Sequence, residues 1–96
     1  MYLLNLSYTK PPAEVAVHTE AHGRWVAKCK DRGVLLFAGP KTSGLGGVIG
    51  ITRMPKEELM ELLGEDPFVQ YDVAEHQIVD FDCKAAQPAV AALIGS

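Results

Sequence analysis

The feature that most constrains this chain is the order of its hydrophobic patterns, which predicts six elements within 96 residues. Short apolar or alternating runs bounded by turn residues indicate strands, and apolar residues spaced by three and four indicate helices. The predicted strands span residues 1–8, 34–38, 48–52 and 73–81, and the predicted helices span residues 13–32 and 55–63. The order β-α-β-β-α-β is that of the α+β ferredoxin-like fold, in which two helices cover one face of a sheet.

Two details refine this prediction. Residues 34–38 are continuously apolar and end at Gly39-Pro40, which predicts a buried second strand in a hairpin with the third. Gly50 interrupts the third strand, and a glycine inside a strand often marks close backbone approach. Residues 84–96 are Ala-rich and weakly helical and have no definite place in the fold, so we predict one domain over residues 1–82 and a C-terminal tail over residues 83–96.

Composition excludes several classes of protein. Hydrophobic residues make up 48% of the chain and charged residues 22%, as in ordinary globular domains. The net charge of -3 and the scattered basic residues argue against nucleic-acid binding. No apolar stretch approaches the ~18 residues needed to span a bilayer, and residues 1–6 do not resemble a signal peptide. We therefore expect no membrane partner and a cytoplasmic location.

Size and cysteine content point to the same kind of protein. Two cysteines, Cys29 and Cys83, are too few for a secreted disulfide scaffold, and we expect both to be reduced. A domain of this size buries only about two-thirds of the surface that its unfolded chain exposes. The uncovered sheet face also needs a cover, so we expect a homodimer that forms a dimeric α+β barrel.

His22 is the first candidate for chemistry, because it shares the apolar face of the first predicted helix with Val15, Val26 and Cys29. An imidazole can give or take a proton near neutral pH. The plain alternative is a core histidine bonded to a backbone carbonyl. Asp66 is the second candidate, because a carboxylate could orient the imidazole and stabilise its cation. The alternative for Asp66 is a helix N-cap before Pro67-Phe68, and one side chain can fill both roles.

Metal and cofactor motifs are missing from the sequence. His18 and His22 have the i, i+4 spacing of a metal pair, but no third ligand accompanies them, so we expect packing or substrate contact instead. The loop from Pro40 to Gly47 matches neither a P-loop nor a dinucleotide fingerprint. We predict that Pro40, Ser43 and His18 contact a small-molecule substrate, although a plain solvent loop is the alternative. No cofactor is expected.

Taken in order, the motifs resemble those of the YCII-related (YciI-like) family. The resemblance covers residues 1–82 and rests on these segments: His22, Gly33, the apolar strand, Ala38-Gly39-Pro40, Gly46-Gly47-Val48-Ile49, Glu57-Glu58-Leu59, Asp66-Pro67-Phe68 and the closing strand at residues 74–81. The resemblance implies a dimeric α+β barrel with a His–Asp pair as active site, which falls on His22 and Asp66.

The resemblance also implies a type of chemistry, because the few family members with assigned reactions act on chlorinated aromatic compounds. The function that we expect is a cofactor-independent lyase of the dehydrochlorinase type, which eliminates HCl from a small chlorinated hydroxylated ring such as 5-chloro-2-hydroxyhydroquinone. Two alternatives remain open: an isomerase or lactone dehalogenase with the same pair, and a non-catalytic dimeric module that binds a small ligand.

Overall fold

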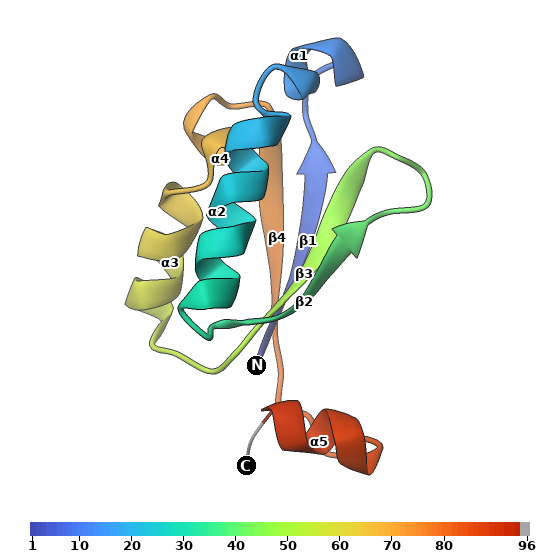
Figure 1. The fold of residues 1–96 in the computed structure, drawn as a ribbon, viewed down its shortest axis with the longest axis vertical. Coiled ribbons are helices and arrows are strands. Elements are labelled where there is room, and N and C mark those ends of the chain that lie inside the picture. Colours follow the sequence, from blue (N-terminus) through green and yellow to red (C-terminus); the bar gives the residue numbers. More distant parts are fainter. Residues whose placement is uncertain (95–96) are drawn as a thin grey trace.

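The computed structural model describes residues 1–94 and shows a four-stranded sheet with helices packed on one face (Figure 1). The predicted order of strands and helices is confirmed, although the first predicted helix is split in two. A short helix follows the cap predicted at Asp66, and one more helix lies in the tail. The elements are β1 (Tyr2–Tyr8), α1 (Pro12–Ala16), α2 (Thr19–Asp31), β2 (Leu35–Pro40), β3 (Gly46–Ile51), α3 (Lys56–Gly64), α4 (Pro67–Gln70), β4 (Ala74–Asp80) and α5 (Pro88–Ile94).

The sheet has the strand order β2-β3-β1-β4, and all three neighbouring pairs are antiparallel. This is the ferredoxin-like order, with β1 at the centre. Leu4 pairs with Ile49 on β3 and with Ile78 on β4, so three apolar side chains lie in one row across the sheet. Because side chains alternate between the two faces of a strand, this row fixes which face meets the helices.

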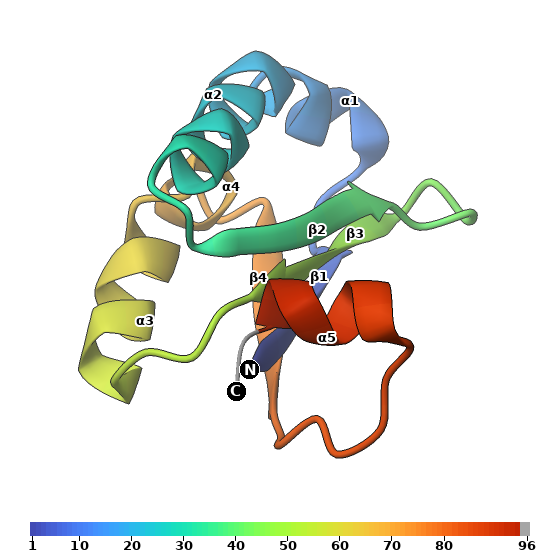
Figure 2. The same ribbon diagram turned by 60° about the horizontal axis from the view of Figure 1, so that its bottom comes forward.

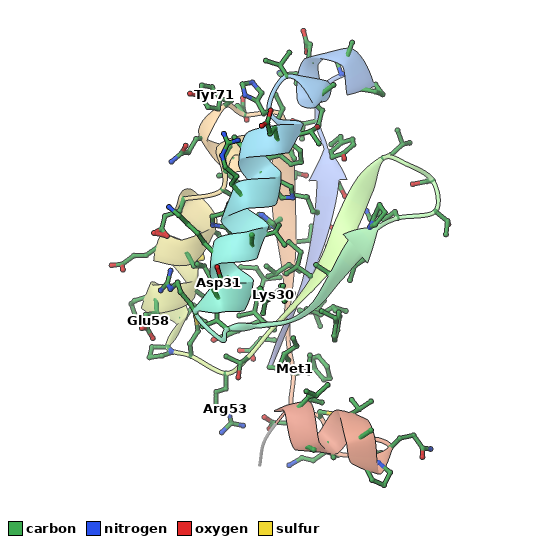
Figure 3. All side chains as sticks on the ribbon, in the orientation of Figure 1. Met1, Lys30, Asp31, Arg53, Glu58 and Tyr71 are labelled. Atoms are coloured by element: carbon green, nitrogen blue, oxygen red, sulfur yellow. The ribbon has the colours of Figure 1, made fainter. Side chains whose placement is uncertain are left out.

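The core lies between that face and helices α2 and α3. Leu4, Ile51 and Leu59 are fully buried there, and the indole N–H of Trp25 donates a hydrogen bond to the carbonyl of Leu62 at 3.1 Å. A second, smaller cluster under α1 and α4 contains Leu6, Val15, Phe68, Val73 and Ala74. Charged side chains on the outer helix faces, such as Lys30, Asp31 and Glu58, point away from the sheet (Figure 3).

The single helix predicted over residues 13–32 is wrong, because the chain forms two helices that are separated at Val17 and His18. His18 has φ −108° and ψ 2°, outside the helical region, and the hydroxyl of Thr19 donates to the carbonyl of Val15 at 3.4 Å. Such a bond from Thr to the carbonyl four residues back is known to bend helices. The break lets Val15 join the smaller cluster while α2 packs over the larger one.

The prediction that residues 34–38 form a buried strand is also wrong. β2 lies at the edge of the sheet with β3 as its neighbour, and 48% of Phe37 is exposed. At Gly50 a close approach is found, and it comes from a side chain: a Cβ at this position would lie 2.5 Å from Cζ of Phe37, so the phenyl ring packs against the bare backbone. An apolar run reports that a strand is hydrophobic, but it does not report whether the partner surface belongs to the same chain.

The tail, which is weakly helical in sequence, contains one helix over Pro88–Ile94. α5 lies beyond one end of the sheet, apart from α2 (Figures 1 and 2), and none of its side chains is buried. The last two tail residues, 95 and 96, lie outside the described residues. Within residues 1–94, no helix has the length and apolarity needed to cross a membrane.

Candidate active site

Asp66 is the residue around which the candidate site is built. It caps α4, with an extended backbone conformation and Pro67 at the first helical position, where a missing N–H does no harm. Its Oδ1 accepts a hydrogen bond from the backbone N–H of Phe68 at 3.0 Å, which confirms the predicted cap. The side chain is fully buried, so a charge here is tolerated only if hydrogen-bond donors surround it.

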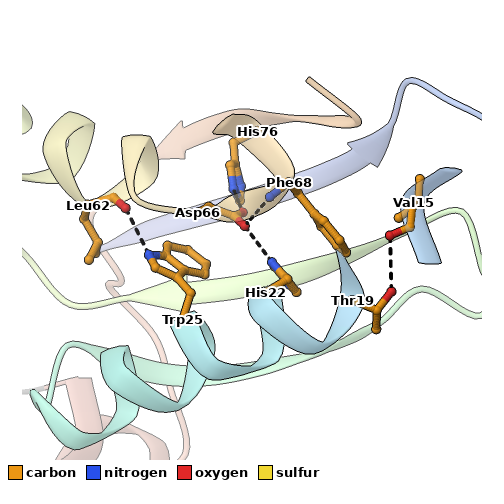
Figure 4. Close-up of polar contacts among 8 residues, drawn as sticks. All are labelled: Val15, Thr19, His22, Trp25, Leu62, Asp66, Phe68 and His76. Atoms are coloured by element: carbon orange, nitrogen blue, oxygen red, sulfur yellow. Dashed lines mark hydrogen bonds and ion pairs between the residues drawn. The ribbon is translucent and has the colours of Figure 1, made fainter. Parts of the chain in front are cut away.

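His22 supplies the second donor. α2 directs the imidazole toward the sheet, and its Nδ1 lies 2.7 Å from Oδ1 of Asp66 (Figure 4). The ring also stacks on Phe68, with centroids 4.0 Å apart and planes 5° from parallel. Folding therefore brings together the two side chains that the sequence singled out, while their roles in catalysis stay predictions.

His76 is the third donor, and sequence reasoning missed it. It lies on β4, is 3% exposed, and places Nε2 at 2.8 Å from Oδ2 of Asp66 (Figure 4). The signal was present in the strand pattern, because His76 falls between Ala74 and Ile78 on the face that meets the helices. A histidine at an inward position of a strand needs a polar partner, and Asp66 is that partner.

Two effects on the Asp66 carboxyl oppose each other. Burial raises its pKa, but the hydrogen bonds from His22 and His76, the charge of protonated His22 and the N–H of Phe68 outweigh burial and lower the pKa to about 2. Asp66 is therefore ionised at neutral pH, and both of its oxygens act as acceptors.

The ionised carboxylate determines which imidazole nitrogens carry protons. Because an ionised carboxylate only accepts, His22 must donate through Nδ1–H and His76 through Nε2–H. In a neutral His22 the lone pair is then on Nε2, and within residues 1–94 no side chain or backbone group bonds to that nitrogen. The arrangement can take a proton at Nε2 and stabilise the resulting cation through Asp66.

A cavity of about 330 Å³ adjoins His22. Its walls come from α2, from the ends of β1, β2 and β3, and from α4, with the rings of Tyr8 and Phe68 packed edge to face at 5.7 Å. The volume lies near the lower limit for small-molecule pockets, which suits a ligand with one ring. No ionisable side chain besides His22 and Tyr8 is among the described residues that line it.

Glycines keep the strand side of this cavity open. Gly46 has φ +155°, and a Cβ there would overlap the carbonyl oxygen of Leu6 on β1. A Cβ at Gly47 would lie 3.1 Å from the carbonyl oxygen of Gly39. Bare backbone therefore forms this wall, and a side chain at Gly46 would both strain the chain and push the strands apart.

The structure separates the three residues that were predicted to contact substrate. Pro40 lines the cavity. Neither His18 nor Ser43 is among the described residues that line it. His18 stacks on Tyr71 at 4.2 Å, at the end of the molecule where Tyr71 is labelled in Figure 3, and the Ser43 hydroxyl accepts a bond from the N–H of Leu45.

A second cavity invites comparison with this site. A larger cavity of about 570 Å³ lies between α2 and α3, but its lining contains neither histidines nor Asp66. Cavity volume alone therefore does not identify the candidate active site.

Within residues 1–94, no three His, Cys, Asp or Glu side chains converge in a way that could hold a metal ion. The oxygens of Asp66 are already occupied by hydrogen bonds.

The sequence and the fold match a known family. The chain belongs to the YCII-related family, whose model, described as a YCII-related domain, matches residues 1–82. A similar solved structure is that of 5-chloro-2-hydroxyhydroquinone dehydrochlorinase from Burkholderia phenoliruptrix AC1100, in complex with 2,5-dihydroxybenzoquinone. The two chains are 16% identical with a TM-score of 0.67, over 85% of this chain and 94% of the other. No curated protein sequence matches this chain.

Proposed function

We propose that this protein is a cofactor-independent lyase of the dehydrochlorinase type that eliminates HCl from a small chlorinated, hydroxylated ring. The observation that carries the proposal is the geometry of His22. Its Nδ1 is held at 2.7 Å by a buried carboxylate, and its ring borders a cavity of about 330 Å³. The solved dehydrochlorinase with the same fold supports the reaction type, because its structure holds a quinone ring.

The proposed reaction begins with His22. Neutral His22 takes a proton from a ring hydroxyl through Nε2, and Asp66 stabilises the imidazolium that forms. A second hydroxyl proton moves to the carbon that bears chlorine. Electrons from the ring oxygen then form a carbonyl, and chloride leaves with the electron pair of the C–Cl bond. Two hydroxyl-bearing carbons are oxidised to carbonyls while the carbon that carried chlorine is reduced from C–Cl to C–H, so the ring supplies its own electrons and the balance needs no external oxidant.

The enzyme's contribution is mainly positioning and general-base catalysis. A positioned base contributes on the order of 10²–10⁴-fold in rate. Tyr8 and Phe68, whose rings pack edge to face, give the cavity an apolar wall, and Phe68 also holds the imidazole plane by stacking. The backbone wall at Gly46 and Gly47 leaves room beside these rings.

Chloride release tests this proposal. Purified protein is incubated with 5-chloro-2-hydroxyhydroquinone under anaerobic conditions, and chloride and the hydroxyquinone product are measured. His22→Asn tests the base most directly. Its amide nitrogen can replace Nδ1 as the hydrogen-bond donor to Asp66, whereas Nε2, the nitrogen proposed to take the proton, is lost. We expect chloride release to fall at least 100-fold. Lys30→Ala, exposed on the same helix (Figure 3), is the matched control and should keep full activity.

The outcomes separate the alternatives. Substrate conversion without chloride would replace the lyase by an isomerase. A ring that binds the wild-type protein but is never converted would leave a non-catalytic binding module. Chloride release by His22→Asn at the wild-type rate would remove His22 from the mechanism.

We further propose that two copies associate through the open faces of their sheets. On that face Leu3 pairs with Val79 across β1 and β4, and 48% of Val79 and of Phe37 is exposed. A second copy would cover these apolar side chains, and family resemblance supports a dimeric barrel. Light scattering tests this: Val79→Asp should give a monomer, whereas Val17→Asp, exposed beside α1, should not change the mass. A monomeric wild-type protein would contradict the proposal.

A further inference from the structure

His76 is a buried titratable group for which the proposed reaction has no step. Its Nε2 contacts Oδ2 of Asp66 at 2.8 Å, on the other side of the carboxylate from His22. Its ring lies 6.1 Å from that of Trp25, centroid to centroid. Since 3% of the side chain is exposed, a ligand in the cavity does not reach it, and it is not among the described residues that line that cavity.

The other nitrogen of His76 indicates its protonation state. Nδ1 is buried and has no hydrogen-bond partner within residues 1–94. A cationic ring would carry an N–H at Nδ1, and burying that charged donor without an acceptor is much less favourable than burying an unused lone pair. The neutral Nε2–H form is therefore the favoured one, and its Nε2–H donates a hydrogen bond to Oδ2 of Asp66. A relay of protons from His22 through Asp66 and out through His76 has no exit at Nδ1.

The contact has a consequence for the orientation of Asp66. The last torsion of an aspartate side chain is broad and has a low barrier, so a carboxylate held at one oxygen can rotate. In this site Phe68 and His22 hold Oδ1, and His76 holds Oδ2. Donors from α2, α4 and β4 thus fix the carboxylate plane, and Oδ1 stays in the position that selects the Nδ1–H tautomer of His22.

We propose that His76 is a positioning residue: from β4 it locks the Asp66 carboxylate and thereby holds His22 in the tautomer whose Nε2 is free to act as a base. This inference rests on the proposed function for its kinetic consequence, but its structural part concerns the protein without substrate. His76 touches no reacting atom and acts through Asp66.

The test combines nitrogen NMR of the imidazoles with kinetics. In wild-type protein at neutral pH, ¹⁵N spectra should show His76 protonated at Nε2 alone and His22 protonated at Nδ1. His76→Leu removes the donor, and we expect His22 to become a mixture of tautomers and kcat to fall by less than the roughly 100-fold expected when the base itself is removed, with little change in KM. His76→Gln places an amide nitrogen near the position of Nε2 and should restore the His22 tautomer and most of kcat.

The result that overturns the proposal is a His22 that keeps its Nδ1–H tautomer in folded His76→Leu, or a wild-type His76 that is protonated at both nitrogens. If His76→Leu does not fold by circular dichroism, a His76→Gln protein in which His22 loses its tautomer also overturns it. A wild-type protein that releases no chloride contradicts the proposed function alone, because the NMR measurements need no substrate and still decide the role of His76.

Discussion

Replacing Asp66 by Asn isolates the charge at the centre of the site. Asn has nearly the same shape, and its amide oxygen can still accept from the N–H of Phe68 and from His22. The replacement removes the ionised form that the site stabilises. The pKa of the Asp66 carboxyl falls from 3.8 to about 2 on folding. At about 1.36 kcal/mol per pH unit, the ionised carboxylate therefore contributes about 2 kcal/mol to the free energy of unfolding at pH 7.

The pH dependence of that contribution has a definite sign. Because the pKa of Asp66 is lower in the folded than in the unfolded chain, the stabilisation is complete above pH 4 to 5. It is lost as the pH falls through about 2, where the folded carboxyl takes up a proton. The stability difference between wild type and Asp66→Asn should therefore shrink by about 2 kcal/mol between pH 5 and pH 2.

Urea unfolding measures this difference at each pH. Trp25 is the single tryptophan of the chain and is buried, so its fluorescence reports unfolding. The subtraction cancels the titration of the other carboxyl groups, which both proteins share. We also expect Asp66→Asn to lose some unfolding free energy at every pH. The amide N–H group of Asn would face the Nε2–H of His76, so two hydrogen-bond donors would oppose each other. A difference that stays constant from pH 5 to pH 2, or grows as the pH falls, would refute the reasoning.

Other predictions concern single positions. Gly46→Ala should lower the free energy of unfolding by about 1–3 kcal/mol, because the new Cβ would overlap backbone at φ +155°. Gly23→Ala, in open space within α2, should raise the free energy of unfolding by about 0.5–1 kcal/mol. Urea unfolding curves of the two variants measure both changes. Ellman's reagent should react with Cys83 in the folded protein but with Cys29 only after unfolding, because Cys29 is buried and burial raises the pKa of its thiol. Arg53→Ala should change stability by at most about 1 kcal/mol, because its ion pair is largely exposed; a larger loss would contradict this.

The candidate site was predictable to the extent that local chemistry reveals it. Asp66 precedes Pro67 and Phe68, and this short segment is enough to predict a helix cap. For such a cap alone, replacement by Ala would cost about 1 kcal/mol. The structure adds full burial and two imidazole donors, so the same replacement should cost about 3–5 kcal/mol.

His76 was missed because its importance is not local. On β4 it looks like any residue of an alternating strand, and its partner lies ten residues earlier, at the start of another helix. The pairing depends on the antiparallel register of β1 and β4, in which Leu6 faces His76. A shift of that register by one residue would turn His76 to the opposite face of the sheet.

The amino-acid sequence by itself determined the order of the strands and helices and the helix cap at Asp66. Each of these follows from interactions among residues close together in the chain, or from a repeated apolar spacing. Only the tertiary structure decided that the first helix breaks at His18, that β2 lies at an edge, and that two histidines share one carboxylate. These features depend on which surfaces meet after the chain has folded, and hydrophobic periodicity specifies that a face is buried without specifying what it meets.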